Sequence, residues 1–121
     1  MANAKNMSAL VVEDDPIVAM ATEEILRSEG YDPVVVCATA KAAVECLATL
    51  APRVLVLDAG LADRADGWMI AELARETVSP RPKMLFVTGS PEAIPSDIAK
   101  LGTVLAKPCT EADFLEALRD T

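Results

Sequence analysis

Arg53-Val54-Leu55-Val56-Leu57-Asp58 is the stretch of sequence that decides the fold. Its residues Val54 to Leu57 are an uninterrupted apolar run, which is typical of a central strand covered on both faces of a parallel sheet. A carboxylate buried without a partner directly after that run would cost several kcal/mol. We therefore expect Asp58 at the carboxyl edge of the strand, where open α/β sheets bind their ligands.

Four further apolar runs alternate with helical patterns along the chain: Ala9–Val12, Val34–Cys37, Met84–Val87 and Val104–Ala106. Strands that alternate with helices across short connections predict a parallel sheet with right-handed crossovers. A chain of 121 residues is the size of one domain. We expect one α/β domain of five strand–helix units over residues 1–121, with its core over about residues 8–120 and no second, output domain.

Capping residues and prolines predict the bounds of two helices. Asp15 is a good N-cap and Pro16 a good first residue for a helix after the first strand. Its core-facing side is expected to be Ile17, Val18, Ala21 and Ile25. Before the fifth strand, Pro91 and Pro95 interrupt the helical pattern, because proline inside a helix is unfavourable by about 3 kcal/mol. We expect only a short helix there, from about Pro95 or Ser96 to Gly102.

Composition excludes several classes of function. The net charge is -8 and no basic run is present, so direct nucleic-acid binding is not expected. The absence of histidine excludes Ser/His and Cys/His catalysis and histidine metal ligands within this chain. The three cysteines form no CxxC pair, which predicts neither a disulfide framework nor a zinc site. With no secretory signal and no membrane-spanning apolar run, we expect a cytoplasmic protein.

Polar residues follow four of the five strands: Glu13 and Asp14, then Asp58, Thr88 and Lys107. The carboxyl ends of parallel strands share one edge, so these side chains should converge. Crowded carboxylates repel unless their protons shift or a cation lies among them. Oxygen ligands alone favour a hard ion, and Mg2+ is the expected cofactor. The set is suited to holding a phosphoryl group beside Mg2+, with Asp58 as nucleophile.

These pieces resemble the receiver domain of bacterial two-component response regulators over nearly the whole chain. The matching segments are Val12-Glu13-Asp14-Asp15, Val56-Leu57-Asp58, Val87-Thr88-Gly89 and Lys107-Pro108, in family order. The resemblance implies a doubly wound, CheY-like sheet in the order 2-1-3-4-5. It also implies that Asp58 accepts a phosphoryl group from a histidine kinase or a histidine phosphotransferase.

The same resemblance implies the roles of the other site residues. Asp14 and Asp58 would ligate Mg2+ directly, Glu13 would act mainly through water, and the Gly60 carbonyl would complete the protein ligands. Thr88 and Lys107 would contact the phosphoryl oxygens. For Asp15, the N-cap role is favoured over metal ligation.

Three departures from the family pattern stand out. The segment after Asp58, residues 59–67, is about one residue longer than usual and lacks its customary proline, which leaves its course open. Val104 occupies the position of the usual switch aromatic, and Cys109 follows Lys-Pro where a phenylalanine is common. The run from Pro82 to Gly89 resembles a subgroup of single-domain regulators known as FAT GUY, which also lacks the aromatic.

The expected function is a phosphorylation-controlled switch that signals by docking to a downstream protein or by acting in a phosphorelay. One alternative is a pseudo-receiver, an interaction module that never gains phosphate. The other is an aspartate-based phosphohydrolase, which lacks support because Gly60 stands where a second aspartate would be needed.

Overall fold

The computed structural model describes residues 7–58 and 65–120, with the side chains of the second range described from residue 67 onward. Its five strands form one parallel sheet in the order β2-β1-β3-β4-β5, as the sequence predicted. They are β1 (Ala9–Val12), β2 (Val34–Cys37), β3 (Val54–Asp58), β4 (Lys83–Thr88) and β5 (Thr103–Ala106).

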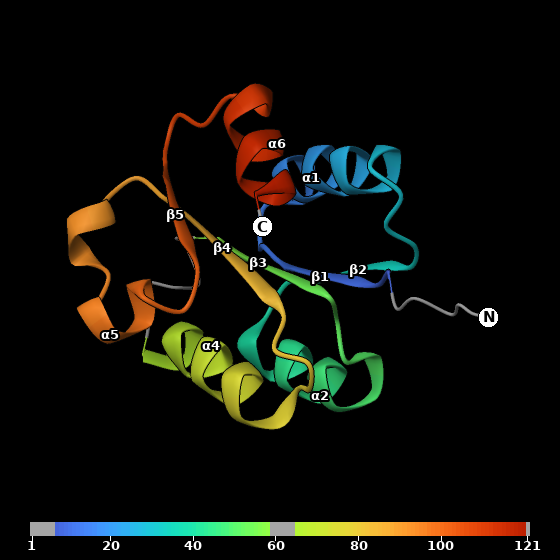
Figure 1. The fold of residues 1–121 in the computed structure, drawn as a ribbon, viewed down its shortest axis with the longest axis vertical. Helices are drawn as coiled ribbons and strands as arrows, with labels where there is room; N and C mark the ends of the chain where they lie inside the picture. Colours follow the sequence, from blue (N-terminus) through green and yellow to red (C-terminus); the bar gives the residue numbers. More distant parts are fainter. Residues whose placement is uncertain (1–6, 59–64, 121) are drawn as a thin grey trace.

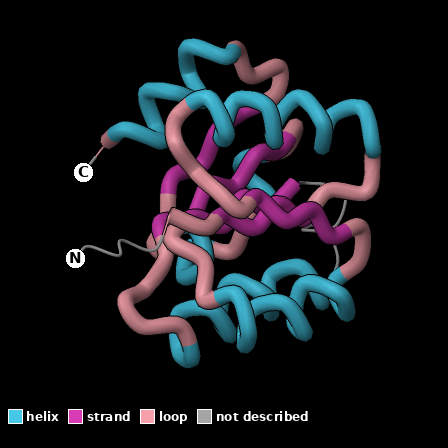
Figure 2. The backbone as a smooth tube through the Cα atoms, turned by 90° about the vertical axis from the view of Figure 1, so that its right-hand side faces the viewer, coloured by secondary structure: helices cyan, strands magenta, loops and turns pink. Residues whose placement is uncertain are grey.

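Two layers of helices cover the sheet (Figures 1 and 2). The helices are α1 (Pro16–Ser28), α2 (Ala40–Leu50), α4 (Ala65–Thr77), α5 (Ser96–Ala99) and α6 (Glu111–Arg119), with a 3-10 turn, η1, at Pro91–Ala93. Helices α1 and α6 lie on one face, and α2, α4 and α5 lie on the other (Figure 1). None of the described helices is long and apolar enough to cross a bilayer.

The strand that ends at Asp58 lies between β1 and β4, in the middle of the sheet. Leu55 and Leu57 belong to the core under α2, α4 and α5, whereas Val54 and Val56 belong to the core under α1 and α6. All four side chains are at most 4% exposed. A strand covered on both faces has no polar side, which is why this run shows no alternation.

Helix α1 begins as predicted but buries a different face. Asp15 caps it by accepting hydrogen bonds from the backbone N–H groups of Ile17 and Val18. The buried residues are Ala19 and Leu26, whereas Ile17 is 78% exposed. The predicted core stripe was therefore wrong at Ile17, Val18 and Ala21, all of which are exposed.

The segment between β4 and β5 is short and broken, as its prolines predicted. Pro91 opens η1, and α5 follows from Ser96 with Ile98 buried beneath it. The helix ends at Ala99, three residues before Gly102, so its predicted end was too late. Beyond it, Gly102 brings the backbone against Met84 of β4, where an added Cβ would lie on the Met84 carbonyl oxygen and 2.8 Å from its carbonyl carbon.

An aromatic pair links α4 to β4. The ring of Trp68 on α4 packs edge-to-face against the ring of Phe86 on β4. Their ring centroids are 6.3 Å apart and the ring planes are inclined by 72°. Phe86 is fully enclosed in the core, whereas Trp68 is half-buried. The pair joins the first turn of α4 to the strand that ends at Thr88.

We predict that Gly102→Ala lowers the free energy of unfolding by about 2 kcal/mol or more, because backbone atoms of β4 cannot yield to the new methyl group. Urea denaturation followed by circular dichroism measures the change. Gly89→Ala is the matched control, since a Cβ there meets nothing within 4 Å. Equal stabilities of the two variants would contradict the close approach.

Candidate functional site

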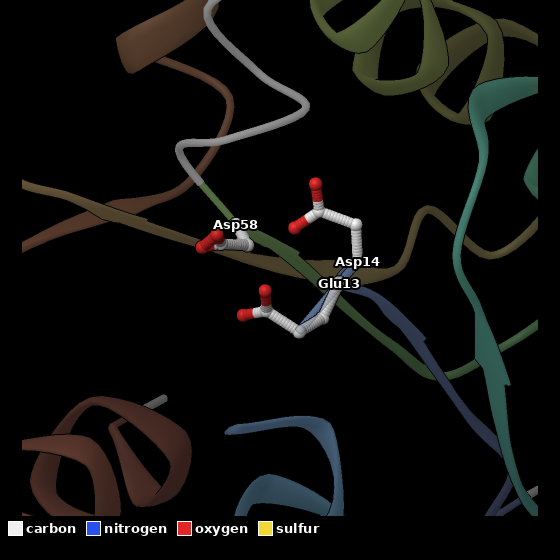
Figure 3. Close-up of side chains that lie close together, drawn as sticks. All are labelled: Glu13, Asp14 and Asp58. Carbon is white, nitrogen blue, oxygen red and sulfur yellow. The ribbon is translucent and has the colours of Figure 1, made fainter. Parts of the chain in front are cut away.

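Three carboxylates meet at the carboxyl edge of the sheet, where β1 and β3 lie side by side (Figure 3). One carboxylate oxygen from each of Glu13, Asp14 and Asp58 lies within 4.8 Å of the others. Glu13 is 6% exposed and Asp58 is 5% exposed, whereas Asp14 faces solvent. The sequence expectation that these three groups converge is met in the structure.

Lys107, which follows β5, reaches across the edge of the sheet to Asp58. Its Nζ donates to Oδ2 of Asp58 at 2.9 Å and to Oδ1 at 3.4 Å. The hydrogen bond to Asp58 raises the pKa of Lys107, and the charges of Asp58, Glu13 and Asp14 add to the effect. The lysine is thus held as a cation beside the three acids.

The pKa of the Glu13 carboxyl is strongly shifted in this arrangement. Burial, followed by the nearby Asp58, raises its pKa from 4.5 to about 7. A hydrogen bond from the backbone N–H of Asp15 to Oε2 of Glu13, 3.1 Å long, acts in the opposite direction. The charged form of Glu13 is therefore disfavoured in this pocket.

Thr88 ends β4 at the same edge and is 2% exposed. Its hydroxyl oxygen accepts a hydrogen bond from the backbone N–H of Ser90 at 2.9 Å. Its carbonyl accepts one from the backbone N–H of Lys107 at 2.7 Å. Because the hydroxyl hydrogen is left to donate elsewhere, Thr88 can hold Ser90 and still serve as a donor.

The donor set at this edge fits a hard divalent cation. All three acidic groups offer oxygen, with no thiolate or imidazole among them, and Mg2+ prefers oxygen ligands. Three carboxylates and one ammonium leave a formal surplus of two negative charges, which a divalent ion would balance. Gly60, the fourth expected ligand, lies outside the described residues, as does most of the segment 59–67.

A groove of about 590 Å3 leads from this edge along α1. Its lining includes Ile17, Val18 and Ala21 of α1, Pro108 and Phe114, and the site residues Asp58 and Lys107. These α1 side chains were expected in the core. A signal was available in the sequence: residues 17–21 are all apolar, which is more than one buried stripe of a helix requires.

Comparisons with known proteins agree with this geometry. The family model described as "Response regulator receiver domain" matches residues 9–119. A comparison with curated proteins found no significant match.

Solved structures resemble the whole chain. A signal receiver domain of a response regulator from Bermanella marisrubri is 26% identical, with a TM-score of 0.79 over 96% of this chain and 98% of that one. SdrG from Pseudomonas melonis, in a BeF3-activated conformation, is 26% identical, with a TM-score of 0.74 over 96% of each chain. A CheY-like receiver domain from Methylobacillus flagellatus, 21% identical with a TM-score of 0.80 over 95% and 98%, shares the fold.

We predict that Glu13→Gln stabilises the protein when divalent cations are removed with EDTA at pH 8. The amide keeps an acceptor for the Asp15 N–H group but removes a buried charge next to Asp58. The expected gain in the free energy of unfolding is roughly 1–3 kcal/mol. Urea denaturation measures it, and Glu24→Gln, at an exposed position of α1, should change stability by no more than about 0.5 kcal/mol. A loss of stability in Glu13→Gln would show that the carboxylates do not repel one another.

Proposed function

The chain belongs to the response regulator receiver domain family, whose members are phosphoacceptor signalling domains, and we propose that Asp58 is its phosphoacceptor. The observation that carries this proposal is the environment of Asp58. It is a buried carboxylate at the end of the central strand, paired with Lys107 and beside two further acids. Residues 9–119 would form the receiver domain.

We propose Mg2+ as the cofactor of the reaction. When bound, the ion would neutralise the pocket and polarise the oxygens of the incoming phosphoryl group. Asp14 and Asp58 would bind it directly and Glu13 through water. The part assigned to the Gly60 carbonyl rests on the family resemblance alone.

In the reaction, a carboxylate oxygen of Asp58 attacks the phosphorus of a phosphohistidine on the donor protein. An O–P bond forms, the P–N bond breaks, and the imidazole leaves with the electron pair of the broken bond. Lys107 is already within hydrogen-bond distance of both Asp58 oxygens, so it need only transfer to a phosphoryl oxygen as charge builds there. Thr88 would donate its hydroxyl hydrogen to another phosphoryl oxygen.

The expected partners are a histidine kinase or histidine phosphotransferase as donor, and a downstream protein as receiver of the signal. A donor must present its phosphohistidine at the open end of the Asp58 pocket. The groove along α1 reaches that end, and its apolar wall of Ile17, Val18 and Ala21 is suited to packing against another protein. Membership of the FAT GUY subgroup stays a prediction.

The output would begin at Thr88. Its hydroxyl holds the N–H group of Ser90, one residue before η1, so a shift of Thr88 towards a phosphoryl group moves the start of this segment. Residues 89–98 carry two prolines and only short helical turns. Such a segment can be repositioned without breaking a long helix, and Val104 offers no ring to rotate in its place.

We predict that incubation with Mg2+ and acetyl phosphate adds one phosphoryl group to the wild-type protein, measured by intact mass. Asp58→Asn should abolish the gain, because the amide is not a comparable nucleophile. Asp97→Asn, at an exposed position of α5, should leave it unchanged. Equal labelling of Asp58→Asn would refute the site; failure of the wild type with this donor and with phosphorylated kinases would favour a pseudo-receiver.

We predict that phosphorylation shifts the backbone amide NMR signals of residues 89–98, and that Thr88→Val reduces these shifts at least about twofold while Asp58 is still labelled. Valine keeps the shape of threonine and adds no charge, but it lacks the hydroxyl that accepts the hydrogen bond from the Ser90 N–H group. Thr49→Val, on the exposed side of α2, is the control. Spectral changes confined to the neighbourhood of Asp58 would contradict this route of output.

A further inference from the structure

Two cysteines far from the proposed reaction lie against each other. The Sγ atoms of Cys37, the last residue of β2, and Cys46, on α2, are 3.6 Å apart. Cys37 is buried in the core beneath α2, and Cys46 is half-buried at the rim of the same core. The sequence alone gave no reason to pair them, because the contact is created by the packing of α2 on the sheet.

We propose that Cys37 and Cys46 are an oxidisable dithiol that closes to an intramolecular disulfide when the protein meets a peroxide. A disulfide requires about 2.0 Å between the sulfurs, so they must approach by roughly 1.5 Å. Rotation of the half-exposed Cys46 side chain supplies a movement of that size. Cys37 is the fixed partner, because it is held in the core.

The surroundings of the two thiols indicate which of them reacts first with the peroxide. Burial raises the pKa of the Cys37 thiol to about 12, so Cys37 is not the thiolate that attacks first. The Cys46 thiolate attacks hydrogen peroxide, whose O–O bond breaks to give a sulfenic acid on Cys46 and hydroxide. The Cys37 sulfur then displaces the sulfenic oxygen as water, its proton leaves, and the S–S bond forms. In sum, two thiols are oxidised and one peroxide is reduced to two molecules of water.

The third cysteine, Cys109, lies apart from this pair. Cys109 follows Lys107-Pro108 and packs against the other core, with α1 and α6 on that side of the sheet. Its thiol donates a hydrogen bond to the Thr110 carbonyl at 3.5 Å. Within the described residues the thiol pair is thus confined to Cys37 and Cys46.

The bridge would lie close to the acidic cluster. The carbonyl of Cys37 accepts a hydrogen bond from the backbone N–H of Glu13 at 3.0 Å, and Cys37 is paired with Val12 in the sheet. Oxidation would therefore fasten α2 to the strand that flanks Glu13. A covalent link of this kind restricts the unfolded chain, so the oxidised protein should resist denaturation better than the reduced one.

The test uses the reduced full chain, freed of reductant and treated with one equivalent of hydrogen peroxide. Alkylation with N-ethylmaleimide under denaturing conditions should then find one free thiol in place of three. Trypsin separates the two cysteines because it cuts after Lys41, so the disulfide should appear as peptide 28–41 joined to peptide 42–53. Dithiothreitol should release both peptides.

Two variants and one control decide the outcome. Cys109→Ala should form the same linked peptides, whereas Cys46→Ala should form no intramolecular link. Oxidation of protein first unfolded in urea should give mixed pairings that include peptide 101–119, because the selectivity depends on the fold. Three alkylated thiols in the treated wild type, dimers linked through Cys109, or the same pairing selectivity in urea would overturn the proposal. None of these measurements uses a phosphoryl donor, so their result is independent of the role of Asp58.

Discussion

The charge balance at the carboxyl edge of the sheet is the constraint on which the rest of the structure depends. Two buried carboxylates, Glu13 and Asp58, are stabilised there: Lys107 pairs with Asp58, and the Asp15 N–H group donates to Glu13. The order of the strands is what brings these groups together, since it places β1 beside β3. The apolar strands that precede Glu13 and Asp58 are buried in the core and fix where the two acids lie.

Hydrogen bonds of Thr88 connect the pocket to the segment between β4 and β5. Thr88 accepts the N–H group of Lys107 through its carbonyl and the N–H group of Ser90 through its hydroxyl. One residue thus connects the lysine that faces Asp58 with the proline-containing segment before β5. Under the proposed switch, a displacement of Thr88 would act on both the lysine and this segment.

Local sequence rules predicted the strand ends and the helix cap at Asp15, because each depends on residues near one another in the chain. The cap at Asp15 and the short helix before Gly102 are examples. The convergence of the acids followed from the alternation of strands and helices, since parallel strands bring their carboxyl ends to one edge of the sheet. The hydrophobic periodicity of α1 could not predict which of its faces is buried, because residues 17–21 are all apolar. The packing of the helix on the sheet buries Ala19 of this run. The Cys37–Cys46 contact likewise depends on how α2 sits on the sheet. Gly60 lies outside the described residues, so its part stays a prediction.

The packing of Trp68 on Phe86 has a spectroscopic consequence. Trp68 is the only tryptophan in the chain, and it lies in the first turn of α4, which follows the segment after Asp58. Its partner Phe86 is two residues before Thr88 on β4. The indole therefore packs on the strand whose last residue, Thr88, belongs to the pocket. Its intrinsic fluorescence would report the proposed ion binding or phosphorylation in unlabelled protein, free of any second tryptophan signal.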